Sequence, residues 1–167
     1  LCINDVPNTQ MQMLGQTSGD QASSINTLLN KWGVNVPKGN FVGDKMLADI
    51  VQLPRSRQPE KLIGLLTFDQ TNKCFSKDSV ISADLKEVKV VFGGVIEPTS
   101  DKTDDIVINP IIQTTAAGNS WQPAAAIKLD ETLDAQMLMS QFTAGTKPQI
   151  VAAVVTGKFK SAFPDGV

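Results

Sequence analysis

The chain has 167 residues, and a hydrophobic content of 41% is enough to bury the core of one globular domain. Its 15 basic and 17 acidic residues are spread evenly, which argues against nucleic acid as a partner. The absence of histidine excludes Ser-His and Cys-His nucleophile pairs and the usual zinc ligands. No apolar run reaches the roughly 20 residues of a membrane-spanning helix. We therefore expect residues 1–167 to form a single soluble domain.

The first residues point to a fragment of a longer protein. The chain begins without Met, and Leu1 to Asp5 resemble the end of a strand that runs into a polar turn. We therefore expect further structure before Leu1. The two cysteines, Cys2 and Cys74, leave two alternatives open: one disulfide, or two small buried side chains.

Apolar residues recur at helical spacing in the first part of the chain, at Ala22, Ile25, Leu28, Leu29 and Trp32. Asp20 or Ser18 would cap the start of this helix, and Gly33 would end it. An apolar stripe of this width docks on a sheet, so Trp32 is expected in the core.

The middle of the chain predicts three strands, at residues 62–68, 88–96 and 106–114. Gly93 and Gly94 would bend or bulge the second strand, and Pro110 would place the third at a sheet edge or a bulge. Residues 46–51 fit a strand or a short helix equally well. Residues 79–85 predict a turn with a short helical piece.

The last part of the chain predicts a second helix and a closing strand. Leu133, Met137, Leu138 and Phe142 have helical spacing over residues 133–142, and residues 150–155 form an apolar run typical of a strand covered on both faces. The order of elements favours an α/β or α+β fold with a mixed sheet and a few flanking helices.

Candidate site residues are few, and each has a structural alternative. Trp121, with Ser120 beside it, is an aromatic residue in a polar stretch, so it could hold the loop in place or bind a ligand or partner. Asp69 and Asp78 could gather around a polar ligand, although turn capping would also explain them. We expect no catalytic residue, no metal site and no cofactor.

Three neighbouring aspartates are a candidate calcium site. Asp101, Asp104 and Asp105 lie close together, but their spacing departs from the helix-loop-helix calcium pattern. A solvated loop is the better interpretation.

Several short segments occur in an order that resembles one family. They are residues 28–34, 41–44, 93–96, 111–115, 120–121 and 154–163. Together they resemble the extracytoplasmic region of the auxiliary component of uncharacterised ABC transport systems, of the gliding-motility type. The resemblance covers most of the chain.

This resemblance implies a membrane-anchored protein whose soluble part lies in the periplasm, with transmembrane helices outside these residues. It implies an ABC permease and ATPase as partners, and an amidotransferase-like or flavodoxin-like domain of which this chain would be a part. The implied role is binding or scaffolding, because the chain lacks the Cys-His pair of true amidotransferases.

Two other functions remain open. An independent ligand-binding module for a saccharide or glycan would have a concave site near Trp121. A hydrolase that relies on carboxylates alone, such as a glycosidase, would need two acidic residues on either side of its substrate.

Overall fold

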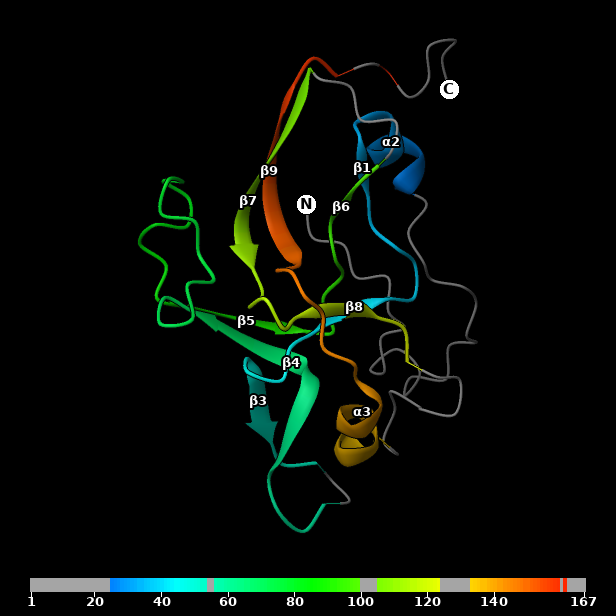
Figure 1. Ribbon diagram of the computed structural model, residues 1–167, viewed down its shortest axis with the longest axis vertical. Helices are drawn as coiled ribbons and strands as arrows, with labels where there is room; N and C mark the ends of the chain where they lie inside the picture. The colour runs from blue at the N-terminus through cyan, green and yellow to red at the C-terminus, as the bar shows by residue number, and fades with distance from the viewer. Residues whose placement is uncertain (1–24, 54–55, 100–104, 124–132, 160, 162–167) are drawn as a thin grey trace, which may run out of the picture.

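The computed structural model describes residues 25–53, 56–99, 105–123, 133–159 and 161. Figure 1 shows an elongated arrangement of short strands with a helix beside each of two groups of strands. The α+β class is confirmed, because both helices and strands occur and the strands pair as antiparallel neighbours. The predicted single mixed sheet is divided into four small sheets in the described residues, because strands far apart in the sequence pair with each other.

The largest sheet has three strands, in the order β3, β4 and β5. They span Ala48–Val51, Glu60–Asp69 and Glu87–Val91. The run of β-branched and aliphatic residues in β4 suits a central strand. Its buried side chains alternate with partly exposed ones toward Asp69, as expected for a strand with one face on the core. The segment 46–51, which fitted a strand or a short helix, is therefore a strand from Ala48, with Met46 and Leu47 in the turn before it.

The predicted strand 88–96 ends earlier than expected. The strand β5 stops at Val91, and Phe92 takes a left-handed backbone conformation with φ 45° before the two glycines. The expected bend at Gly93-Gly94 is confirmed, but it interrupts the strand. The chain then continues as β6, Glu97–Pro98, which pairs with β1, Val34–Asn35.

A two-stranded sheet joins β7, Ile106–Gln113, to β9, Ile150–Gly157. The register between them shifts after Pro110, so the predicted bulge is confirmed. The expectation that residues 150–155 are covered on both faces is wrong, because all six are only partly buried. The reason is that β9 belongs to a narrow two-stranded ribbon rather than to the centre of a layered sheet (Figure 1).

The remaining sheet pairs β2, Phe41–Gly43, with β8, Asn119–Trp121. Trp121 was predicted in a loop, and it lies instead at the end of this strand, opposite Phe41. The polar residues around β8 gave no local signal of a strand, and its pairing partner, β2, lies far away in the sequence.

Both helices are shorter than predicted. The helix α2 spans Asn26–Lys31 and begins after Ile25, and the predicted caps Asp20 and Ser18 lie outside the described residues. It ends at Gly33, which has a φ of 74°, as expected. The helix α3 spans Ala135–Gln141, with the Asp134 side chain accepting a hydrogen bond from the Met137 amide as the N-cap.

The helix α3 packs its buried face against β4. Ala135, Leu138 and Phe142 are buried there, whereas Met137, which was assigned to the apolar stripe, is 43% exposed. The buried stripe consists of Ala135, Leu138 and Phe142, which are three and four residues apart and so share one helical face, and Met137 lies off that face. Neither α2 nor α3, the helices in the described part of the chain, has the length and hydropathy of a membrane-spanning helix.

Three apolar clusters form the core. The first lies between β4, β2 and the end of β7, the second joins β2 and β4 to α3, and the third lies under α2 and β1. Trp32 is partly buried on the third cluster, which confirms the predicted core position, and its ring lies 5.1 Å from that of Phe159.

Candidate functional site

Trp121 is part of an aromatic group on β2, β8 and α3. Its ring meets the Phe41 ring edge-on at a centroid distance of 5.0 Å, and the Phe142 ring edge-on at 6.0 Å. Such edge-to-face pairs stabilise a fold beyond the area they bury. The indole is half-buried, so its buried part packs against the neighbouring rings and its exposed part is accessible to a ligand.

Ser120 has its own partner next to this group. Its hydroxyl oxygen accepts a hydrogen bond of 3.1 Å from the side-chain amide of Asn40. Ser120 and Trp121, the two candidate site residues on β8, therefore both have structural contacts.

Asp69 and Asp78 lie elsewhere in the structure. Asp69 is the last residue of β4, and Asp78 lies in the segment that follows this strand. The Asp69 carboxylate accepts hydrogen bonds from the backbone amide of Asn72, at 2.7 Å, and from its side-chain amide. This geometry is a turn cap. Asp78 is exposed further along the same segment. Among the described contacts, none joins these aspartates to Ser120 or Trp121.

The candidate calcium cluster is largely outside the described residues. Asp101 and Asp104 are not described, and Asp105 is exposed. The described part of the chain contains no group of three or more His, Cys, Asp or Glu side chains that could hold a metal ion.

The segment between β4 and β5, residues 70–86, forms a projection at the side of the molecule (Figure 1). It contains hydrogen-bonded turns, including bonds from the Ser82 and Ala83 amides to the Ser79 carbonyl, and no helix. The turn predicted for residues 79–85 is therefore confirmed, and the helical piece is limited to the single turn closed by the bonds to the Ser79 carbonyl. The Ser79 hydroxyl accepts a bond from the Ile81 amide, which stabilises the turn.

Two sets of contacts hold this projection in place. At its base, Phe75 bridges to Ile112 of β7, and the Ser76 amide donates to the Ile111 carbonyl at 3.0 Å. At its neck, the side-chain amide of Gln70 donates to the Leu85 carbonyl at 2.8 Å and to the Ala83 carbonyl at 3.3 Å.

Inside the projection, the fully buried Ser82 donates its hydroxyl to the Ser76 carbonyl at 2.9 Å. Together with the contacts at the base and at the neck, this bond gives the long loop a defined shape.

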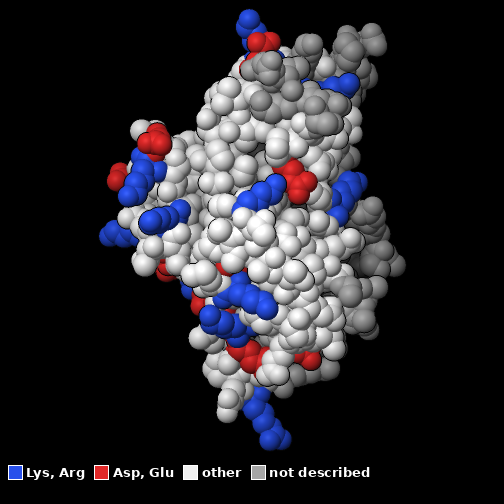
Figure 2. All heavy atoms as spheres, viewed as in Figure 1, with Lys and Arg blue, Asp and Glu red and all other residues white. Residues whose placement is uncertain are grey.

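Two adjacent apolar side chains of the projection are exposed. Val80 is 96% exposed and Ile81 is 58% exposed. The charged residues around them are exposed and of both signs, as Figure 2 shows over this part of the molecule: Lys73, Lys77, Asp78, Asp84 and Lys86. In the same view the face over β7 and β9 is mostly uncharged.

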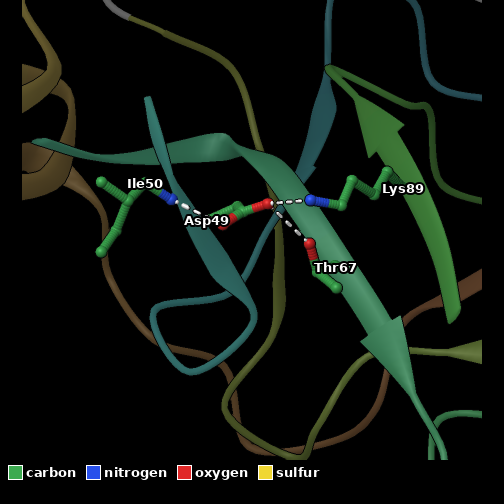
Figure 3. Close-up of polar contacts among 4 residues, drawn as sticks. All are labelled: Asp49, Ile50, Thr67 and Lys89. Atoms are coloured by element: carbon green, nitrogen blue, oxygen red, sulfur yellow. Dashed lines mark hydrogen bonds and ion pairs between the residues drawn. The ribbon is translucent and has the colours of Figure 1, made fainter. Parts of the chain in front are cut away.

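An ion pair links the two outer strands of the three-stranded sheet. The Lys89 ammonium lies 2.7 Å from Oδ2 of Asp49, and the Thr67 hydroxyl donates to the same oxygen at 2.9 Å (Figure 3). The hydrogen bonds from Lys89, the Ile50 amide and Thr67 lower the pKa of Asp49 from 3.8 to about 2. The same pairing raises the pKa of Lys89. The three side chains join β3, β4 and β5 across their solvent-facing side.

The comparisons with known proteins give one match. The family model described as "ABC-type uncharacterized transport system" matches residues 2–167. The chain belongs to this family. It is an auxiliary component of an ABC-type transport system, as the resemblance predicted. No curated protein and no solved structure matches the chain.

In this member of the ABC-type family, sequence reasoning missed two features. Asp44 is a fully buried carboxylate that accepts three hydrogen bonds, and it had been noted only as part of a short motif. Val80 and Ile81 had been assigned to a helical turn. A signal for the second feature exists in the sequence: an apolar pair enclosed by Ser79 and Ser82, with charged residues on both sides, is typical of an exposed turn.

Cys74 of this auxiliary component is a buried free thiol, and Cys2 lies outside the described residues. The alternative of a buried small side chain is therefore correct for Cys74. Burial raises the pKa of this thiol, and the nearby charges of Asp69 and Asp44 raise it further. These conditions are the opposite of those that activate a nucleophilic cysteine.

Proposed function

We propose that this chain is a non-catalytic interaction domain of its ABC transport system, at the extracytoplasmic face of the membrane. The observation that carries the proposal is the family match over residues 2–167, which covers nearly the whole chain. In this proposal the partners are the permease and, through it, the ATPase. Membrane anchors outside these residues hold the domain in the periplasm beside the permease.

The architecture supports an interaction role. A surface that recognises a partner must keep its shape, because ordering a flexible loop on binding reduces affinity. The projection 70–86 meets this requirement through its contacts with β7 and through Gln70 at its neck. We propose that the domain recognises a partner or transported ligand and transmits this event to the permease through its membrane anchors.

The test is purification of the complete protein from gently solubilised membranes, followed by mass spectrometry of what accompanies it. The proposal expects a permease and an ATPase of one transport system. A tagged, unrelated membrane protein purified in parallel serves as the control for non-specific recovery. Recovery of the protein alone, or with envelope proteins unrelated to transport, would contradict the proposal.

The gliding-motility assignment is a narrower part of the proposal. It rests only on the resemblance of the short segments. Deletion of the gene in a gliding bacterium that encodes it would abolish surface movement if the assignment is right. Normal movement of the deletion strain would limit the proposal to transport in general.

A second candidate function is binding of a saccharide or glycan. The observation that favours it is the half-buried Trp121 ring in an aromatic group that also has the Lys45 ammonium 6.0 Å from the centre of the Phe142 ring. Saccharides stack on partly exposed aromatic rings of this kind. The midpoint temperature of thermal unfolding should then rise when a suitable oligosaccharide is added, and Trp121→Phe should reduce this rise.

No catalytic role is proposed. Sustained turnover of a glycoside or ester by the purified domain, lost on substitution of an acidic residue, would contradict this part of the proposal.

A further inference from the structure

The strand β5 lies at the edge of the three-stranded sheet, and its outer side pairs with no other strand in the described part of the chain. The Thr67 amide of β4 donates to the Leu47 carbonyl at 2.9 Å, on the β3 side of β4. Both backbone polar groups of a strand residue point to the same side, so Thr67 and its partner Lys89 form a pair without backbone hydrogen bonds. The amide and carbonyl of Lys89 therefore point outward, away from β4.

The same alternation extends along the whole of β5. The Phe92 amide donates to the Gly64 carbonyl on β4, as expected three residues after an outward-facing residue. Glu87, Lys89 and Val91, all of them exposed, therefore present their backbone amides and carbonyls to the open side. These groups repeat about every 7 Å, which is the spacing of alternate residues in an extended strand. The ligand that matches such an edge is another strand.

The lysine of β5 does not guard this edge. Natural edge strands are often protected by a lysine whose charge stands at the edge and repels an incoming strand. Lys89 is the lysine of this strand, and Figure 3 shows its side chain directed across β4 toward Asp49 on β3. The ammonium is bonded there at 2.7 Å. The edge of β5 is therefore left open to a further strand.

Glu87 lacks a cation of its own on this face of the sheet. It lies opposite Asp69 of β4, and like charges in opposed positions are destabilising. Among the residues that the structure describes, no lysine or arginine forms an ion pair with Glu87. Glu87 and Lys89 are two residues apart and so share one face of the strand. A cation supplied from the open side, opposite Glu87, would complete the arrangement.

We propose that β5 pairs with β5 of a second copy of this chain, antiparallel and centred on Val88. This register places Glu87 of each copy opposite Lys89 of the other, in two symmetric charge pairs. An ammonium has three donors, so Lys89 can hold Asp49 and the incoming Glu87 together. A register centred on Lys89 would instead oppose two lysines, which is unfavourable. The two three-stranded sheets then form one continuous sheet, a self-association that goes beyond the proposed function.

The small size of the pairing decides where it should be measured. Stable interfaces bury roughly 1,200 Å² or more, and two short edge strands provide less. The pairing is therefore weak in dilute solution. The proposed membrane anchors would confine two copies and raise their effective concentration. The test accordingly uses the complete protein in its own membrane.

A cysteine at the proposed axis tests the register directly. In a Cys2→Ser background, Val88→Cys places two Cα atoms at a non-hydrogen-bonded position, about 4.5 Å apart, which is within the range of a disulfide. Mild oxidation should then give a covalent dimer on a non-reducing gel. Val91→Cys is the matched control, because Val91 is exposed, at 58%, on the same strand. Its copies would lie roughly 20 Å apart in this register and should not cross-link.

A charge variant gives an independent measurement. Glu87→Lys in the Val88→Cys background opposes lysines in both symmetric contacts and should lower the yield of covalent dimer by roughly tenfold. Thermal unfolding should stay the same, because Glu87 is exposed. Added salt should reduce the difference in yield.

Three results would overturn the proposal: no dimer from Val88→Cys, equal dimer from Val91→Cys, or an unchanged yield with Glu87→Lys. Cross-linking of Val88→Cys only to a different protein would also overturn it, because the occupant would then not be a second copy. Recovery of a permease and an ATPase with the wild-type protein is a separate measurement, so either proposal can fail without the other.

Discussion

Asp44 accepts two hydrogen bonds from Thr115, one of 2.9 Å from its amide and one of 2.7 Å from its hydroxyl. The carboxylate is fully buried, and its other oxygen accepts the Met46 amide at 2.8 Å. The bonds fasten the turn after β2 to the segment that leads into β8. Because β2 and β8 form one sheet, Asp44 fixes the pairing of two strands that the sequence places far apart.

Replacement of Asp44 by Ala should destabilise the protein by about 2 kcal/mol, because the buried carboxylate is lost and the part-buried donors of Met46 and Thr115 lose their acceptor. Urea unfolding measures this change as a lower midpoint with an unchanged slope. Thr115→Val is the matched comparison and should cost about 1 kcal/mol. It removes the hydroxyl that donates to Asp44 and accepts from the Ala117 amide, and it keeps the backbone bond to Asp44. Equal stability of wild type and Asp44→Ala would show that the carboxylate does not hold the two segments together.

The pair of Asp49 and Lys89 should contribute to acid stability. The pKa of Asp49 in the folded state, about 2, lies below the unfolded value of 3.8. Its contribution is therefore present above pH 4 and is lost as the pH falls through about 2. Asp49→Asn should flatten the dependence of the unfolding free energy on pH in this window, with only a small change at neutral pH because the pair is largely solvent-exposed.

Two checks isolate this ion pair. Added salt should reduce the difference between wild type and Asp49→Asn, because exposed charges are screened. Lys89→Met should produce a smaller flattening of the same sign, because the bonds from the Ile50 amide and the Thr67 hydroxyl remain. In the Asp49→Asn background, Lys89→Met should add no further flattening. Parallel pH curves for wild type and Asp49→Asn would rule out the pair as the source of the acid dependence.

The sequence predicted those elements whose signal is local. The aliphatic run of β4 and the apolar spacing of α3 identified both elements, and Gly33 correctly marked the end of α2. Where the prediction failed, the deciding contact was distant in sequence. Trp121 became part of a strand only because Phe41 lies opposite it, and no local pattern contains that pairing.

The candidate site shows the same limit. The turn-capping role of Asp69 was predictable, because an aspartate at a strand end followed by Asn72 is a local motif. The exposure of Val80 had only the flanking serines as a local signal, because apolar residues are usually buried. The contacts of Gln70 and Ser82, which hold the turn in place, appear only in the structure.

Gly64 of β4 is required by the ring of Phe92. A Cβ added at Gly64 would overlap that ring, whose residue is held in a left-handed conformation and donates its amide to the Gly64 carbonyl at 2.6 Å. Gly64→Ala should destabilise the protein by roughly 1 to 3 kcal/mol through overpacking. In a Phe92→Ala background the same substitution should cost much less.

The two single variants and the double variant form a cycle that measures this contact. Chemical unfolding should give a coupling of about 1 kcal/mol or more, the size expected for residues in direct contact. Gly93→Ala is unsuitable as a control because its added Cβ would meet Val90. Additive effects in the cycle would show that Phe92 moves away from Gly64 without cost.

Cys74 should be unreactive in the folded protein. It is 2% exposed, and burial raises the pKa of its thiol, so the fraction of thiolate at neutral pH is smaller than in an unfolded chain. In a Cys2→Ser background, alkylation of the native protein should be on the order of 100-fold slower than in denaturant, because it requires local opening. Labelling should therefore follow the unfolding transition across a urea series. Rapid labelling in buffer, at the rate of a small thiol, would mean that the core between β4 and β7 opens readily and that the base of the projection is not fixed.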